Sequence, residues 1–476
     1  MKLFRTLTVL IVALSMVLTA CAPAATEAPT TVPATKAPTA APTEAPVPTA
    51  EVAVPTVEAT AAPTAETVPT GLTCAEPIKV GLITDASGPL AIYGAHILRS
   101  FMLGMEYATG VEGSAGPKFD LKESQESTFK FDNCEVIVYV RDDASNPQNT
   151  ATVARELIDV QKVNFLVGTV SSGATATLQG IALESKIPLI VAPAAANDIT
   201  GKDFNEYTFR VSRNNYQDAI NECKALTKKY TKFIQIAPDY AFGRGSADAF
   251  RDACTLDGGS FVADDIFAPT TTTDFTPYME QIAQSDAEAY IVTWAGAGFV
   301  ALVKAAKDQG VTESKALGAT FIDNALMPTF FSNAVGTTAG ILYHYSAPKN
   351  AANDFLVAQD KARYGVMPDL FDADGMNAAI MVVESIKKTE GDVNGDVLVK
   401  AMEGMSFDGP KGTIEIRPED HVAIQDMYIL KLANVTDTNA GYYEYVDTTR
   451  PVPPCLLPET LKARCGALPY GNLSGK

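Results

Sequence analysis

Residues 78–94 read IKVGLITDASGPLAIYG, and this stretch decides the fold class. Its first seven residues form a short apolar run that predicts a β-strand, and the strand leads into an acidic residue and then small ones. The same arrangement recurs at residues 135–140, 165–169, 188–192, 232–237, 289–293 and 316–321. Amphipathic segments such as residues 150–160 separate these runs. Strands that alternate with helices in two series predict an α/β protein with two lobes, each built on a doubly wound parallel sheet.

The loops that follow three of these strands are the first candidates for a ligand site. They span residues 85–88, 169–173 and 192–197, and they consist mainly of small residues, so their backbone amides can approach an anion closely. Ligands of open α/β sheets bind beyond the carboxyl ends of the strands, where loops and helix N-termini meet. A helix N-terminus carries about half a positive charge, which favours a carboxylate.

The first residues of the chain predict export. Two basic residues precede an apolar run over residues 7–18, which is too short to span a bilayer. The run leads into Leu-Thr-Ala-Cys at residues 18–21, which resembles the bacterial lipobox. We therefore expect residues 1–20 to be a lipoprotein signal peptide and Cys21 to carry lipid, at the outer face of the bacterial cytoplasmic membrane or in the periplasm. The alternative is an ordinary signal peptide with an incidental cysteine.

Residues 21–72 predict a disordered tether. They are almost entirely Ala, Pro, Thr, Val and Glu and include no aromatic residue from which a core could form. Their prolines favour an extended conformation of about 3.1 Å per residue, long enough to hold a folded region away from a membrane.

Composition limits the partners of the folded region. The formal net charge of -19 argues against nucleic acid and anionic lipid headgroups, so contact with the membrane is expected only through the lipid. No C-x-x-C motif occurs, and His96, His344 and His421 are far apart in sequence, so we expect no metal and no cofactor.

Six cysteines besides Cys21 predict disulfides in an exported protein, with fifteen possible pairings. Cys74 and Cys134 each precede a predicted strand and lie side by side if those strands are neighbours. Two further cysteines fall on consecutive predicted helices and two lie close together near the C-terminus. These are Cys223 with Cys254, and Cys455 with Cys465.

The opening stretch, taken with later segments in the same order and spacing, resembles the leucine/isoleucine/valine-binding family. Its members are type I periplasmic solute-binding proteins of ABC transporters. The later segments are RDDASNP at 141–147, LVG at 166–168 with Ser171-Ser172, IPLI at 187–190, DYAFG at 239–243 and GPKG at 409–412. The resemblance covers residues 75–445 and implies two lobes joined by three crossovers, a small-molecule ligand in the cleft, an ABC permease as partner and a monomer.

The resemblance also implies lobe boundaries and site residues. The first lobe takes 73–205 and 325–408, the second takes 206–324 and 409–445, and 446–476 form a C-terminal tail. Two loops are expected to hold a ligand carboxylate through backbone groups and a hydroxyl, and two aromatic residues are expected to cover the ligand. The loop residues are Ser171, Ser172, Gly173, Ala194, Ala195 and Ala196, and the aromatic residues are Tyr93 and Phe242. Ala196 departs from the family, where a threonine is common at this position.

The partner of a ligand ammonium group is the larger departure. Amino-acid binders of the family place an acidic residue in the second lobe, but residues 293–300 contain none. Asp323 either takes this role or caps a helix. Trp294, the only tryptophan, either stacks on the ligand or packs in the core. A branched-chain or other amino acid is the first expectation, and the alternatives are an amide, a urea-like compound, an aromatic carboxylate, or a sensor coupled to a receptor.

Enzyme motifs are poorly matched. Residues 168–173 do not meet the G-x-S-x-G spacing of a nucleophile elbow, and residues 296–298 lack the third glycine of a dinucleotide-binding loop. We therefore expect no catalytic residues.

Overall fold

The computed structural model describes residues 71–114, 116, 125–319 and 321–476. These residues belong to one compact unit, Thr67–Lys476. The expected signal peptide, Cys21 and nearly all of the expected tether lie outside the described residues. Across the ranges that are described, no helix has both the length and the apolar character needed to cross a membrane.

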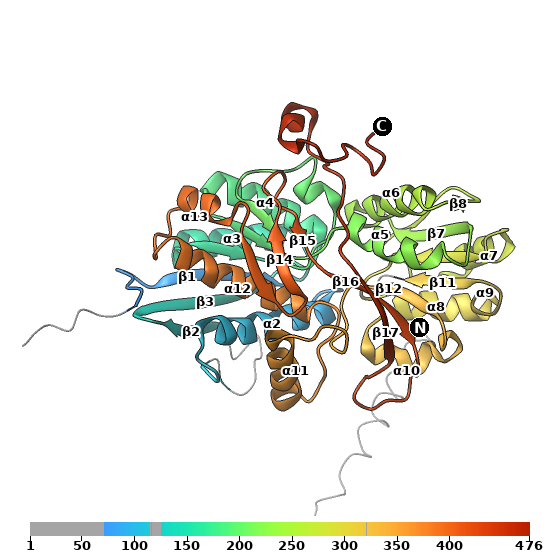
Figure 1. Ribbon diagram of the computed structural model, residues 1–476, viewed down its shortest axis with the longest axis horizontal. Coiled ribbons are helices and arrows are strands. Elements are labelled where there is room, and N and C mark those ends of the chain that lie inside the picture. The colour runs from blue at the N-terminus through green and yellow to red at the C-terminus, as the bar shows by residue number, and fades with distance from the viewer. Residues whose placement is uncertain (1–70, 115, 117–124, 320) are drawn as a thin grey trace, which may run out of the picture. The chain divides into compact units, whose positions relative to one another are not determined.

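The first lobe is built on a six-stranded sheet with strand order β2-β3-β1-β4-β5-β6 (Figure 1). Its strands are β1 (Ile78–Thr84), β2 (Glu126–Phe131), β3 (Cys134–Asp142), β4 (Phe165–Val167), β5 (Leu189–Val191) and β6 (Thr208–Arg210). Edge strand β2 runs antiparallel to β3, and all other neighbours are parallel. Its helices are α2 (Ala91–Thr109), α3 (Pro147–Glu156), α4 (Ser172–Ser185), α11 (Ala351–Tyr364), α12 (Asp372–Lys388) and α13 (Gly395–Met402).

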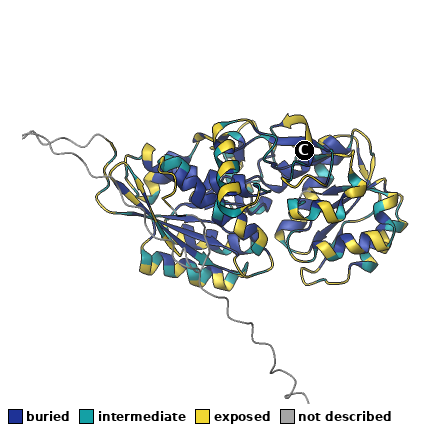
Figure 2. Ribbon diagram, turned by 90° about the horizontal axis from the view of Figure 1, so that it is seen from below, coloured by how far each residue is buried: buried dark blue, intermediate teal, exposed yellow. Residues whose placement is uncertain are grey.

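The second lobe is built on a parallel sheet with strand order β11-β10-β7-β8, in which β9 also pairs with β7. Its strands are β7 (Lys232–Pro238), β8 (Ser260–Phe261), β9 (Ile266–Ala268), β10 (Ala289–Val292) and β11 (Ala316–Ala319). Its helices are α5 (Asn215–Leu226), α6 (Ala241–Leu256), α7 (Thr276–Gln284), α8 (Phe299–Asp308), α9 (Val311–Ser314) and α10 (Met327–Phe330). The central strands of both large sheets are buried, whereas edge strands β2 and β8 are largely exposed and the helices expose their outer sides (Figure 2). All seven predicted strands are present, and the doubly wound α/β fold is confirmed.

Two small antiparallel sheets complete the fold. One contains β12 (Thr338–Ile341), β16 (Met427–Leu432) and β17 (Tyr443–Thr449), and the other contains β13 (Ser406–Gly409), β14 (Gly412–Ile416) and β15 (Ala423–Ile424). Short helical turns lie at Leu157–Gln161, Asn197–Thr200, Asn324–Leu326, Ser332–Ala334 and Glu459–Cys465. The first small sheet packs on α5, where the Asn221 side-chain amide donates hydrogen bonds to the carbonyls of Ile341 (3.3 Å) and Tyr428 (3.2 Å).

The lobe boundaries differ from those expected. Residues 206–211 belong to the first lobe, because β6 pairs with β5. Residues 412–424 also lie with the first lobe, because Val422 bridges to Arg210 of β6 and β14 pairs with both β13 and β15. Residues 325–341 belong to the second lobe instead, because Met327 packs in the core of that lobe and β12 lies on α5. The chain therefore passes between the lobes after β6, after β12 and after β15.

Three disulfides link the six cysteines as expected. Cys74 bonds to Cys134, Cys223 to Cys254 and Cys455 to Cys465. The first pair is close because β1 and β3 are parallel neighbours, which brings their N-terminal ends together. The second joins α5 to α6, and the third closes a loop near the C-terminus.

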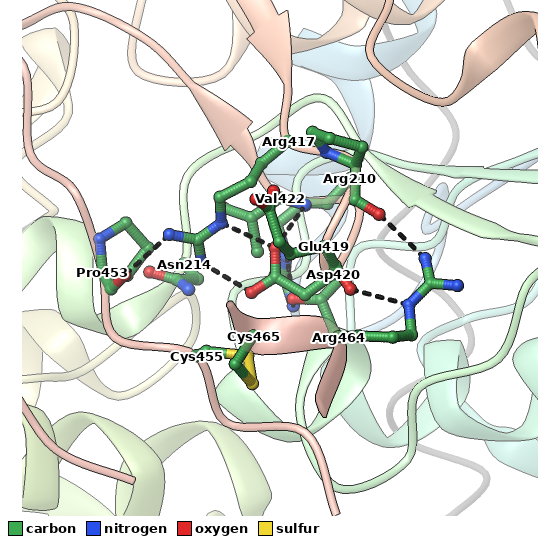
Figure 3. A network of polar contacts seen from close by, with 12 residues as sticks. Arg210, Asn214, Arg417, Glu419, Asp420, Val422, Pro453, Cys455, Arg464 and Cys465 are labelled. Carbon is green, nitrogen blue, oxygen red and sulfur yellow. Dashed lines mark hydrogen bonds and ion pairs between the residues drawn. A yellow bond between two sulfur atoms is a disulfide. The ribbon is translucent and has the colours of Figure 1, made fainter. Parts of the chain in front are cut away.

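The C-terminal segment, residues 450–476, contacts both lobes. Arg464 donates through Nε to the carbonyl of Glu419 (3.0 Å), on the loop between β14 and β15 (Figure 3). The backbone N–H of Leu473 donates to the Asp252 carboxylate (2.7 Å) on α6. This tail therefore bridges a first-lobe loop and a second-lobe helix.

Two close backbone approaches shape the loops at the carboxyl edge of the first sheet. A Cβ on Gly94 would lie 1.6 Å from the carbonyl oxygen of Asp85, so only glycine lets α2 pack against this loop. Gly168 has a φ of 129°, and a Cβ there would lie 2.0 Å from the carbonyl oxygen of Ile83. Both glycines bring loops together at the edge that faces the second lobe.

Candidate ligand-binding cleft

A small cavity of about 30 Å³ lies between the two lobes, at the carboxyl ends of their strands, so side chains nearly fill this part of the closed cleft. Residues from both lobes line it. They are Leu90, Tyr93, Val170, Ser172, Pro193, Ala194, Ala195, Arg213, Tyr240, Phe242, Ala295, Phe321 and Phe371. No carboxylate is among these lining residues, and a single guanidinium is the only group with a full charge.

The lobes touch each other at the edge of this cavity. The backbone N–H of Ala297 in the second lobe donates to the carbonyl of Pro89 in the first (3.1 Å). The next contact uses Tyr93, whose hydroxyl accepts a hydrogen bond from the N–H of Gly296 (3.1 Å). Burial raises the pKa of Tyr93 well above its usual value, and the nearby Asp323 carboxylate adds to this rise. Backbone and side-chain contacts thus hold the cleft closed.

The first-lobe loops supply polar groups from α4 and from the segment after β5. The Ser172 hydroxyl accepts a hydrogen bond from the backbone N–H of Ala196 (3.2 Å), which ties these two loops together. The N-cap residue of α4, Ser171, makes no side-chain capping hydrogen bond, so the N–H groups of the first turn have no side-chain partner there. The positive end of the helix dipole therefore faces the cavity at Ser172.

The structure brings only part of the predicted loop set to the cavity. Ser172, Ala194 and Ala195 line it, as expected for carboxylate-binding loops. Ser171, Gly173 and Ala196 are not among the lining residues. The carbonyl of Ser171 accepts from the N–H of Thr175 within α4 (2.8 Å), and that of Ala196 accepts from Arg210 (2.6 Å).

Arg213 is the functional candidate that the sequence patterns missed. Its side chain is 1% exposed, and Nη1 donates to the carbonyl of Pro193 (2.6 Å). Nε lies 3.3 Å from the carboxylate of Asp218. The guanidinium carbon lies 5.1 Å and 4.9 Å from the ring centroids of Phe321 and Phe371. The signal for this residue is its place just beyond the end of strand β6, which faces the cleft.

Aromatic rings form the walls around this guanidinium. Phe321 lies 5.6 Å from Phe242 and 5.8 Å from Phe371, measured between ring centroids. Tyr93 meets Phe371 edge to face at 4.9 Å, and Tyr240 lies 5.8 Å from Phe242. Tyr93 and Phe242 were expected from the sequence, whereas the other three were not. The result is an apolar chamber with one cationic group.

Trp294 lies outside the cavity lining. It is 2% exposed, packs in the core of the second lobe and meets Phe275 edge to face at a centroid distance of 4.8 Å. Its indole N–H donates to the carbonyl of Ala297 (3.1 Å). Of the two roles considered for Trp294, the structure therefore shows core packing, and it does not place the ring as a wall of the cleft.

Asp323 also lies outside the lining, one layer behind Tyr93. It is 4% exposed, and burial raises its pKa to about 6, while a hydrogen bond from the Tyr93 hydroxyl opposes the rise. It precedes the short helix Asn324–Leu326, but its side chain makes no capping hydrogen bond. Asp323 therefore stands at the N-cap position without capping the helix through its side chain, and it is not among the residues that line the cavity.

The sequence of the chain matches that of a known protein family. Residues 77–439 match the sequence pattern of a periplasmic binding protein family. The chain belongs to the periplasmic binding protein family. As a periplasmic binding protein, it is a solute-binding protein of the ABC-transporter type, and membership places its work outside the cytoplasm.

Three individual proteins illustrate the similarity of this chain to known proteins in sequence and in fold. A Leu/Ile/Val-binding protein homolog 6 from Brucella melitensis is 25% identical over 76% of this chain and 89% of its own length. An ABC-type branched-chain amino acid transporter protein from Rhodopseudomonas palustris is 32% identical, with a TM-score of 0.64 over 79% of this chain and 97% of that one. A second R. palustris solute-binding protein, solved in complex with 3,4-dihydroxybenzoic acid, is 27% identical, with a TM-score of 0.66 over 79% and 98%.

Proposed function

We propose that this protein captures a small carboxylate with a flat or apolar body and no ammonium group, and delivers it to an ABC permease. The observation that carries the proposal is the cavity lining, which combines five aromatic rings and one buried arginine with no carboxylate.

Charge favours an anionic ligand in this cavity. An ammonium group buried beside Arg213 without an acidic partner would cost several kcal/mol in lost solvation and repulsion. A carboxylate would instead gain hydrogen bonds to a planar, desolvated guanidinium, which suits two-oxygen recognition. The guanidinium donates from Nη1 to the carbonyl of Pro193 and faces Asp218 through Nε, so the N–H groups of Nη2 remain for a ligand.

The rings favour an aromatic body. Five aromatic side chains at centroid distances of 4.9–5.8 Å from one another can meet a flat ligand face to face or edge to face. The R. palustris relative solved with 3,4-dihydroxybenzoic acid supports this ligand class.

An aliphatic amino acid is the second candidate. The names of two relatives refer to branched-chain amino acids. Asp323 favours this candidate through one observation, since its carboxylate is buried next to Tyr93, a residue of the cavity wall. A rotation of Tyr93 would have to open a path from an ammonium group to Asp323.

Delivery and anchoring are part of the proposal. Closure of two lobes on a ligand requires contacts from both, and the lining supplies them from both. The closed surface would then be recognised by the permease, with the protein held as a monomer at the outer face of the membrane by lipid on Cys21. Coupling to a receptor in place of a permease would use the same cleft.

A thermal-shift panel tests the ligand class. Purified protein is unfolded and refolded to remove bound ligand, and benzoate, 4-hydroxybenzoate, benzamide, leucine and phenylalanine are then added at millimolar concentration. A ligand at 100 times its Kd stabilises the closed form by about 2.7 kcal/mol, a shift of a few degrees. Stabilisation by the benzoates supports the proposal. Stabilisation only by leucine, lost in Asp323→Asn, would replace it with the second candidate.

A further inference from the structure

We propose that His96, Asp323 and Asp369 form a binding site for one divalent transition-metal cation, with Zn²⁺ as the best fit. The three residues come from α2, from the segment after β11 and from the turn before α12. A ring nitrogen of His96 and one carboxylate oxygen from each aspartate all lie within 4.8 Å of one another. None of the three residues lines the cleft cavity.

Two buried polar atoms of this cluster have no hydrogen-bond partner. His96 is 5% exposed and its Nδ1 is unpartnered, and Asp323 is 4% exposed with an unpartnered Oδ1. Buried polar atoms in folded proteins are nearly always bonded, so two unpartnered atoms in one cluster indicate a missing cation or other partner. A metal ion coordinated through these two atoms would satisfy both.

The charge of the cluster also favours a cation. Among the described residues, no lysine or arginine forms an ion pair with Asp323 or Asp369. Arg99, on the same helix as His96, is held by Asp372 and Asp360. Two carboxylates and a neutral imidazole would exactly offset a charge of +2, so the cation would leave the buried cluster neutral.

The donor set and its support suit zinc. One imidazole and two carboxylates provide three ligands, and a water can take the fourth position. Ligand atoms on a tetrahedral Zn²⁺ lie about 3.3 Å apart. Side-chain rotations that bring the ligand atoms about 1–1.5 Å closer together would therefore complete the site. The Asp369 carboxylate is already oriented, because it accepts hydrogen bonds from the N–H groups of Asn324 (2.8 Å) and Leu370 (2.9 Å).

An entry path is present. His96 and Asp369 both line a surface cavity that also contains Arg99 and Asn324. A hydrated cation can therefore reach the cluster without opening the cleft between the lobes. Imidazole in the donor set disfavours Mg²⁺ and Ca²⁺, which prefer oxygen ligands.

The test is calorimetric titration of ZnCl₂ into the purified protein after chelator treatment, with MgCl₂ as a second titrant. We expect one Zn²⁺ per chain and no heat from Mg²⁺. His96→Gln and Asp369→Asn should each weaken binding by more than about 100-fold, since loss of an outer-shell partner alone costs about 10–100-fold. His344→Gln is the matched control, because His344 is a buried histidine elsewhere whose ring bonds to Ser346 and Ala440, and it should bind Zn²⁺ as the wild type does.

Three results would overturn the proposal. They are no Zn²⁺ binding by the wild type, unchanged binding in both His96→Gln and Asp369→Asn, and equal loss in the His344→Gln control. Circular dichroism identifies a variant that fails to fold. Asp369 is only half-buried, so Asp369→Asn is expected to fold whether or not the site binds Zn²⁺. No organic solute is used, so failure here leaves the proposed ligand class untouched.

Discussion

Replacement of Arg213 by glutamine tests how the cleft would bind a carboxylate. The change keeps a long polar side chain but removes the charge and the planar fork. The Arg213 side chain is 1% exposed and lies between two phenylalanine rings at 4.9 and 5.1 Å, so its hydrogen bonds to a ligand would form with little water. A hydrogen bond to a charged partner in such a setting contributes about 1.5–3 kcal/mol, which corresponds to about 10–150-fold in Kd.

The effect of this change on folding stability must be separated from its effect on ligand binding. Asp218 lies 3.3 Å from Nε of Arg213 and is itself 3% exposed. A buried carboxylate that loses its partner costs about 3–5 kcal/mol in stability, which could hide an effect on binding. The comparison is therefore made between Asp218→Asn and the double variant Arg213→Gln/Asp218→Asn. Arg155→Gln serves as the control, because Arg155 is 55% exposed on α3.

Isothermal titration with benzoate and benzamide gives the result. These ligands share a shape but differ in charge. We expect the double variant to bind benzoate about 10–150-fold more weakly than Asp218→Asn does, with a much smaller change for benzamide. Equal losses for both ligands would show that Arg213 only shapes the cavity. No loss for benzoate would show that the carboxylate lies elsewhere, and either result refutes the reasoning.

Three further predictions concern stability and the cleft walls. Replacing Cys74 and Cys134 by serine opens a loop of 60 residues and should lower the free energy of unfolding by about 4 kcal/mol in urea titrations; a loss below about 1 kcal/mol would contradict the chain-entropy account. Burial raises the pKa of Glu222 to about 8, so the wild type should lose stability as the pH rises from 4.5 through 8, whereas Glu222→Gln should lose less by a few kcal/mol; parallel pH profiles of urea midpoints would refute this. Trp294→Phe should lower the melting temperature and leave the solute Kd unchanged, because the ring packs in the core; a large change in Kd would return Trp294 to the cleft.

Stability falls with rising pH at Glu222 because burial raises the pKa of this side chain more than its hydrogen bonds from backbone N–H groups lower it. The folded state favours the protonated acid, so stability is fully present below the unfolded pKa of about 4.5 and falls as the pH rises to about 8. The backbone N–H of Gly340 donates to this side chain, and a glutamine oxygen can accept the same bond. The variant therefore isolates the charge.

The sequence predicted the strands of the two large sheets better than the connections between them. Runs of apolar residues ended in small or acidic ones, so the seven strands and the parallel arrangement could be predicted. Strand β6 is only three residues long, Thr208–Arg210, and gave no comparable run. Missing β6 moved the expected first crossover and concealed Arg213, which follows it by three residues.

Side-chain positions in the cleft depended on packing between distant segments. Tyr93 and Phe242 lie in segments that resemble the family, so they could be predicted, and both line the cavity. Phe371 lies in a segment without such a motif and reaches the cavity only because α12 packs beside α2. Asp323 was considered as a cap or as an ammonium partner, and neither pattern could show that it would face His96 and Asp369.

The C-terminal tail changes the mechanics of the hinge. Three crossovers already connect the lobes, and residues 450–476 add a non-covalent link, with hydrogen bonds to Glu419 of the first lobe and to Asp252 of the second. Opening of the cleft must therefore stretch or break these hydrogen bonds, so the tail favours the closed arrangement. The Cys455–Cys465 disulfide limits how far the tail can extend as the lobes separate. A fluorophore attached near Lys476 would report lobe movement from outside the cleft, without touching a residue that contacts solute.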